Sequence, residues 1–238
     1  MDSSHRPWPV PDSPWIMTQN WRHVLFAHWP VDPDLIRPYI PDTLELDLYD
    51  GQAWIGYIFL KINGVRLRYT PVVPFLSSYP ELNVRTYVNY GDKSGVYFFS
   101  LDADHLPVVM GARSLFYLPY TLSKIAVKKD RKGIACNCRR VGSSKTFEAR
   151  YWPASETFCA EKGSLDYWLS ERYCLYTEHD GGLYRCDILH EPWPLQQAEA
   201  EISKNTMMVD FEGISLSRDP LLHYADRQKV LMWGLQLV

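Results

Sequence analysis

Polar and charged side chains alternate with apolar ones along the segment Pro80–Asn89. Successive side chains of a β-strand point to opposite faces, so Glu81, Asn83 and Arg85 are expected on one face. Two interpretations of this face stay open: it is the water-facing side of an ordinary half-buried strand, or it lines an enclosed pocket. In a pocket, burial raises the pKa of a carboxyl such as Glu81 and a nearby arginine lowers it. Such a pair is suited to acid–base chemistry.

Two further segments carry candidate binding groups. Arg22 begins a strand expected over 22–29, and a guanidinium binds a carboxylate through two parallel hydrogen bonds. The alternative is an arginine at the solvent end of that strand. Tyr117 and Tyr120 belong to an aromatic cluster around Pro119, for which packing alone is the competing explanation.

The elements that must position these groups are mostly short strands. Strands are expected at 22–29, 51–60, 65–69, 81–90, 96–101, 122–128, 134–140, 146–152, 173–178 and 183–190. Asn63-Gly64 and Gly181-Gly182 are typical of hairpin turns. Short helices are expected after Asp32, over 108–116 and after Ser164, with a final turn at 219–222. So many short strands predict a mainly β, β-rich α+β fold with a closed or nearly closed antiparallel sheet.

Composition excludes several classes of protein. The 238 residues carry a formal net charge of −3, so no basic excess is present to bind nucleic acid. No apolar run approaches the roughly 20 residues that span a bilayer, and residues 1–15 do not resemble a signal peptide. Five cysteines without paired C-x-x-C motifs predict reduced thiols, no metal site and a cytoplasmic location.

Three segments, in order, resemble acetoacetate decarboxylase and its relatives. The first is Arg22 followed by Trp29, Asp32-Pro33-Asp34-Leu35 and Ile40-Pro41-Asp42-Thr43-Leu44-Glu45; the second is Tyr79-Pro80-Glu81; the third is Leu101-Asp102, Pro107, Gly111, Arg113 and Pro119. Together they cover roughly residues 20–125. The segment Pro-Glu-Leu-Asn-Val-Arg-Thr-Tyr-Val, residues 80–88, resembles the YqjF-like bacterial proteins of unknown function more closely than it resembles the decarboxylases.

The resemblance implies an antiparallel barrel or cone with a central cavity, formed by a single domain over 15–238 after a Pro-rich arm at 1–14. It also implies that Arg22 and Glu81 line the cavity. The family's catalytic lysine, which forms a Schiff base, directly follows the proline equivalent to Pro119. Here Tyr120 and Thr121 follow that proline, and neither forms an imine. Lys124 is the nearest lysine.

The combined expectation is an enzyme that acts on a small carboxylate or carbonyl compound without a Schiff base. Glu81 is the predicted acid or base and Tyr120 a hydrogen-bond donor; Arg22, Asn83, Arg85 and Tyr117 are the predicted ligand-binding groups. The alternatives are a non-catalytic ligand-binding protein, a structural domain with a filled cavity, and a decarboxylase that uses the displaced Lys124. No cofactor or membrane partner is expected, and a homodimer is considered because homo-oligomers are common.

Overall fold

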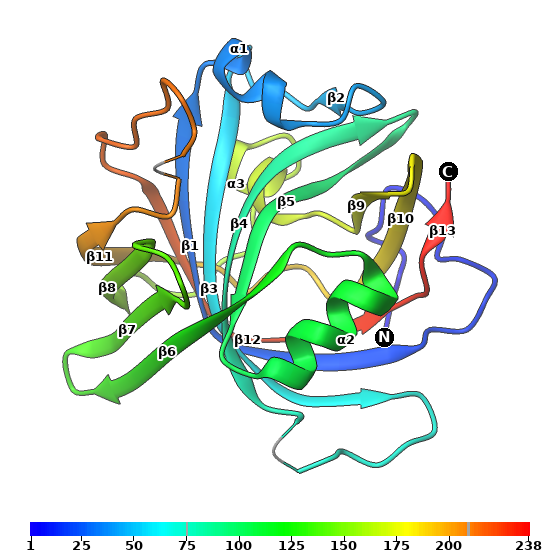
Figure 1. Cartoon of the computed structure of the whole chain (residues 1–238), viewed down its shortest axis with the longest axis horizontal. Helices are drawn as coiled ribbons and strands as arrows, with labels where there is room; N and C mark the ends of the chain where they lie inside the picture. Colours follow the sequence, from blue (N-terminus) through cyan, green and yellow to red (C-terminus); the bar gives the residue numbers. More distant parts are fainter. Residues whose placement is uncertain (75, 209) are drawn as a thin grey trace.

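The computed structural model describes residues 1–74, 76–208 and 210–238. Within them, thirteen strands pair in one sheet in the order β13-β10-β9-β5-β6-β7-β8-β11-β12-β1-β3-β4-β2 (Figure 1). The strands are β1 Met17–Val31, β2 Glu45–Leu46, β3 Ala53–Leu67, β4 Tyr79–Tyr90, β5 Lys93–Ala103, β6 Tyr120–Asp130, β7 Gly133–Arg140, β8 Thr146–Pro153, β9 Cys174–His179, β10 Gly182–Leu189, β11 Gln196–Asn205, β12 Leu221–Met232 and β13 Gln236–Leu237. The helices are α1 Pro33–Ile36, η1 Arg37–Tyr39, α2 Leu106–Phe116 and α3 Leu165–Ser170.

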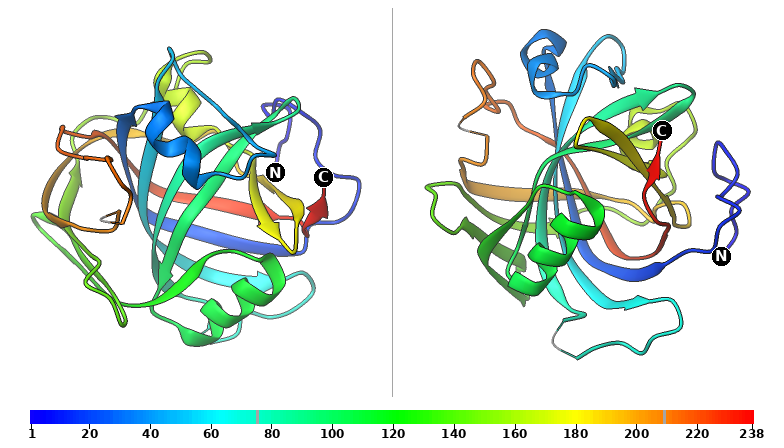
Figure 2. Two further views of the ribbon diagram at one scale, coloured as in Figure 1. Left: turned by 45° about the horizontal axis from the view of Figure 1, so that its top comes forward. Right: turned by 45° about the vertical axis from the view of Figure 1, so that its right-hand side comes forward.

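The sheet closes on itself twice, and five strands belong to both closures. The five shared strands are β1, β3, β4, β5 and β12. Together with β9 and β10 they close one ring, and together with β6, β7, β8 and β11 they close another. We call the first ring the cavity barrel and the second the packed barrel. The two views of Figure 2 show the long shared strands curving between them. All pairings are antiparallel except β5–β6 and β5–β9.

Each barrel has its own apolar core, which explains the composition of the shared strands. Residues 53–60 of β3 are all buried because alternate side chains enter opposite cores. The same holds for β5, where Val96 and Phe98 face the cavity barrel while Tyr97 and Phe99 pack against the other core. The mainly β fold class predicted from the sequence is confirmed.

Most of the predicted elements are present, two predictions are wrong, and β11 was missed. Asn63-Gly64 is not a hairpin: β3 continues through it, and Gly64 (φ +62°) adopts its left-handed conformation at a register shift where β3 has one residue more than β1. The turn expected at 219–222 is the start of β12. β11 was not expected, because its residues are mostly polar and few of them are apolar enough to give a strand pattern.

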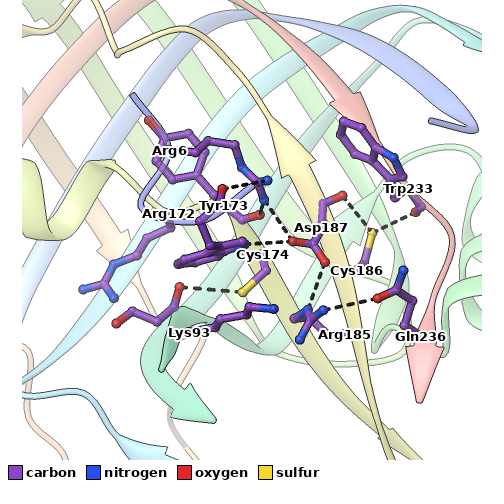
Figure 3. A network of polar contacts seen from close by, with 12 residues as sticks. Arg6, Lys93, Arg172, Tyr173, Cys174, Arg185, Cys186, Asp187, Trp233 and Gln236 are labelled. Carbon is purple, nitrogen blue, oxygen red and sulfur yellow. Dashed lines mark hydrogen bonds and ion pairs between the residues drawn. The ribbon is translucent and has the colours of Figure 1, made fainter. Parts of the chain in front are cut away.

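The N-terminal arm is attached to the cavity barrel through a buried ion pair (Figure 3). Nη2 of Arg6 lies 2.9 Å from a carboxylate oxygen of Asp187 on β10, and both side chains are almost completely buried. Nε of Arg185 donates to the other oxygen of this carboxylate at 2.9 Å, and the indole N–H of Trp8 donates to the oxygen that Arg6 binds, at 3.1 Å. The C-terminus follows β13, and the N-terminal arm also contacts the segment after β10, where Nε2 of His5 lies 2.6 Å from the carbonyl oxygen of His190. None of the helices in the described ranges is long and apolar enough to cross a lipid bilayer.

Candidate functional site

The cavity barrel encloses a cavity of about 80 Å³. Most of its wall is apolar, with side chains from β1, β3, β5, β9, β10 and β12. Fewer than half of the wall residues are polar, and they come mainly from β4, the start of β6 and the segments next to β9 and β10: Gln19, Glu81, Asn83, Arg85, Tyr120, Ser170, Arg172 and His190. An apolar cavity with a few convergent polar groups is the usual form of a small-molecule site.

The polar face of β4 points into this cavity. Glu81, Asn83 and Arg85 all line it, while Leu82 and Val84 enter the core of the packed barrel. Glu81 is 4% exposed and Asn83 is 6% exposed. The alternative of a polar face in water is therefore wrong for this strand.

The Glu81 carboxyl lies in a setting that brings its titration close to neutral pH. Tyr120 donates a hydrogen bond to Oε2 at 2.6 Å, and the Asn83 amide donates to Oε1 at 3.3 Å. Burial raises the pKa of Glu81 from 4.5 to about 7, with the two hydrogen bonds opposing the rise and the charge of Asp102 adding to it. The side chain is thus able to accept and release a proton under ordinary conditions.

Tyr120 reaches Glu81 because it is the first residue of β6. There β6 pairs in parallel with β5 over Leu101–Ala103, next to the segment of β5 that pairs with Glu81. Burial raises the pKa of Tyr120 well above its usual value, and the neighbouring Glu81 charge raises it further. The hydroxyl consequently keeps its proton and serves as a donor.

Arg172 is a cavity residue that the sequence did not indicate. It lies between α3 and β9 and is 5% exposed. Its Nε donates to the carbonyl oxygen of Trp168 at 2.7 Å, and its Nη1 pairs with the Asp47 carboxylate. Burial lowers the pKa of Arg172, opposed by Asp47, but a guanidinium stays charged. The local sequence pattern does not predict a cavity position for Arg172, because the long-range pairing of β5 with β9 places it there.

Two other wall residues come from the segment after β10. Trp193 packs edge-on against Phe26 at 4.8 Å between ring centroids and also borders the cavity. His190 is buried, and burial lowers its pKa, opposed by the Glu171 charge and by the backbone carbonyl groups beside the ring. Its two nitrogens face the backbone carbonyl groups of Glu191 and Arg172.

Arg22 does not line the cavity, contrary to the expectation carried by the resemblance. The chain bulges at His23 (φ 53°), with a register shift against β3 between Arg22 and Leu25. Trp21 and Val24 therefore both face the cavity barrel, and the two residues between them face outward. The guanidinium of Arg22 lies 3.8 Å from the Asp226 carboxylate with 42% of its side chain exposed.

Tyr117 and Lys124 also lie outside the cavity. Tyr117 ends α2 in a left-handed conformation and stacks on His179 at 3.8 Å between ring centroids, in an open surface groove. Lys124 is exposed, because only the start of β6 reaches the cavity before the strand continues along β7. Among the described residues that form the cavity wall, none is a lysine.

The fold is that of acetoacetate decarboxylase. The structure superimposes on acetoacetate decarboxylase from Legionella pneumophila with a TM-score of 0.66, covering 99% of this chain and 93% of that one at 13% identity. The enduracididine biosynthesis enzyme MppR, solved in complex with pyruvate, gives a TM-score of 0.66 over 94% of this chain and 91% of that one at 12% identity. At these identities the likeness concerns the fold alone.

The sequence gives the closer relationship. Residues 18–229 match the family DUF2071, described as an uncharacterized conserved protein, and the chain belongs to this family. It is 52% identical to the uncharacterized protein YqjF of Bacillus subtilis over 229 residues, which cover 95% of this chain and 94% of that protein.

Proposed function

We propose that this protein is an enzyme that moves a proton at a carbon next to the carbonyl group of a small oxo compound. The observation that supports the proposal most strongly is Glu81, a buried carboxyl in the wall of a small cavity with a pKa of about 7. A catalytic base works best when its pKa lies near the working pH.

In the proposed reaction, the Glu81 carboxylate takes a proton from the carbon next to the carbonyl. The electron pair of the broken C–H bond forms the C=C bond of an enolate while the π pair of the carbonyl moves to its oxygen, and Tyr120 stabilises this oxygen by donating a hydrogen bond. Return of the proton from the Glu81 carboxyl to the carbon restores the oxo compound and the carboxylate. Tyr120 has a single hydroxyl proton, so donating it to the substrate removes one hydrogen bond from Glu81. The carboxylate then becomes a stronger base at the moment it acts.

The proposal excludes a Schiff base. The lysine next to the proline is replaced by Tyr120, and Lys124 is exposed on the packed-barrel part of β6. The pyruvate named in the MppR structure supports a small oxo acid as the kind of molecule this fold accommodates, by analogy of fold only. The five cysteines are free thiols, which suits a reducing compartment, and we place the activity in the cytoplasm.

Proton exchange in D2O tests the proposal without knowledge of the natural product. The protein is incubated with 2-oxo and 3-oxo acids of three to five carbons and with the matching ketones, and loss of the α-proton signal is followed by proton NMR. We expect exchange above the buffer rate for at least one compound. Glu81→Gln should slow it at least about 100-fold, the usual contribution of a positioned acid or base.

The matched control is Arg22→Met, which changes a charged side chain outside the cavity. It should leave the exchange rate unchanged. Exchange that persists in Glu81→Gln contradicts the role of this carboxyl. Binding without any exchange supports the alternative, a non-catalytic ligand-binding protein.

A further inference from the structure

Two arginine side chains meet in the wall of the cavity. Both guanidinium groups lie near the Tyr87 ring, whose centroid is 4.8 Å from the guanidinium carbon of Arg172 and 5.6 Å from that of Arg85. The Tyr87 hydroxyl is held 2.7 Å from Nε2 of the buried His28. The ring is therefore fixed at its far end and lies within cation–π distance of both arginines. Arg172 also lies 4.4 Å from the centre of the Trp168 ring.

The charges at this point do not balance. Arg172 pairs with the Asp47 carboxylate, which compensates one positive charge. The ion pairs of the described residues include no carboxylate for Arg85. One positive charge is thus left without an ion-pair partner at the arginine end of a cavity wall that is otherwise mostly apolar. An enclosed cation of this kind is costly unless an anion accompanies it.

The hydrogen-bonding groups are also incomplete. Nη2 of Arg172 and Nε of Arg85 are buried and have no hydrogen-bond partner in the described part of the chain. Both arginines line the cavity. Buried donors without partners are rare and destabilising, so two of them in one cavity wall indicate an acceptor that enters the cavity.

We propose that Arg85 and Arg172 together bind the carboxylate of a small oxo acid, so that the cavity selects a monoanion over a neutral ketone of the same shape. This inference rests on the proposed function, since it names the substrate class for the same cavity. A carboxylate has two oxygens for the two donors and one negative charge for the one uncompensated cation. A phosphate dianion carries a second charge, for which the cavity wall has no further cation.

The arrangement also orients the ligand. Glu81 and Arg85 are four residues apart on one face of β4, so their Cα atoms are separated by about 13 Å. A carboxylate bound near the arginines directs the rest of a short oxo acid along the strand towards Glu81 and Tyr120. The acid–base groups and the anion-binding groups thus occupy different ends of one cavity.

Binding measurements test the inference independently of turnover. Isothermal titration calorimetry is carried out with pyruvate, 2-oxobutanoate and acetoacetate, with the neutral analogue pyruvamide, and with inorganic phosphate. We expect the wild-type protein to bind at least one of the oxo acids and to bind pyruvamide and phosphate at least about 30-fold more weakly than that acid. The variants Arg85→Met and Arg172→Met should weaken binding of that acid by at least about 30-fold, the loss typical of a truncated buried charge pair.

Arg22→Met serves as the matched control, because Arg22 lies outside the cavity, and it should bind as the wild type does. Arg172 contributes to packing through Asp47 and Trp168, so thermal unfolding is recorded for each variant. Arg85→Met keeps the test valid if Arg172→Met does not fold. Failure of every oxo acid to bind, equal binding of pyruvamide, or unchanged binding in Arg85→Met overturns the inference.

The two proposals fail in different ways. Selective binding of an oxo acid that depends on Arg85, without any proton exchange, keeps this inference and contradicts the proposed function. Exchange that depends on Glu81 but proceeds equally well with a neutral ketone and in Arg85→Met keeps the proposed function and contradicts this inference.

Discussion

Removing the hydroxyl of Tyr120 should move the titration of Glu81 to higher pH. In Tyr120→Phe the ring stays and the 2.6 Å hydrogen bond to Oε2 of Glu81 is lost. This bond stabilises the ionised carboxylate more than the neutral acid, so its loss must raise the pKa. A hydrogen bond to a charged group contributes about 1.5–3 kcal/mol, and each pKa unit corresponds to about 1.4 kcal/mol. The pKa of Glu81 should therefore rise from about 7 to roughly 8–9.

Infrared difference spectra recorded over a pH titration measure this pKa through the C=O stretch of the protonated carboxyl. The band assigned to Glu81 is the one that disappears in Glu81→Gln. Tyr117→Phe is the control, because the Tyr117 side chain lies in the surface groove outside the cavity. It should titrate as the wild type does. A midpoint in Tyr120→Phe that is unchanged or lower would refute the argument that this hydroxyl stabilises the carboxylate.

Three other predictions concern stability and the excluded chemistry. Glu81 holds its proton in the folded state up to about pH 7 and loses it near 4.5 when unfolded, so it lowers the free energy of unfolding of the wild type progressively as pH rises between these values. Over the same window the free energy of unfolding of Glu81→Gln should rise by about 3 kcal/mol relative to that of the wild type, as measured by urea unfolding at several pH values. Arg6→Ala leaves the buried Asp187 with Arg185 as its remaining ionic partner and should lower the free energy of unfolding by about 3 kcal/mol, whereas an unchanged urea midpoint contradicts a structural role for the N-terminal arm. Borohydride reduction in the presence of oxo acids should add no mass to the protein, and a mass increase that Lys124→Ala abolishes would restore the Schiff-base alternative.

Local patterns in the sequence were sufficient for the strand that carries the acid–base group. The alternation along Pro80–Asn89 predicted which side chains of β4 share a face, because this strand has no irregularity of its own between Glu81 and Arg85. The helix after Asp32 was predictable for a similar reason: the Asp32 carboxylate accepts from the backbone N–H of Asp34, and a proline follows the cap.

The residues that were misplaced or missed are positioned by bulges and long-range strand pairings, which the periodicity of the sequence does not predict. A bulge at His23 reverses the face of Arg22, and no residue type in that segment signals it. Gly64 suits a bulge as well as a hairpin turn, since both use a left-handed glycine. Arg172 reaches the cavity only because β9 pairs with β5, strands separated by some seventy residues of chain. Such long-range pairings are set by packing of the whole barrel.

The pH dependence of proton exchange tests the central claim most directly. If Glu81 is the base in the cavity, the exchange rate of an oxo acid that binds should rise with pH and level off above a midpoint near 7, the pKa of the buried carboxyl. The midpoint should move upward in Tyr120→Phe, and the pH-dependent component should be lost in Glu81→Gln. A rate that does not depend on pH between 5 and 9, or a profile that Glu81→Gln leaves unchanged, would contradict the account.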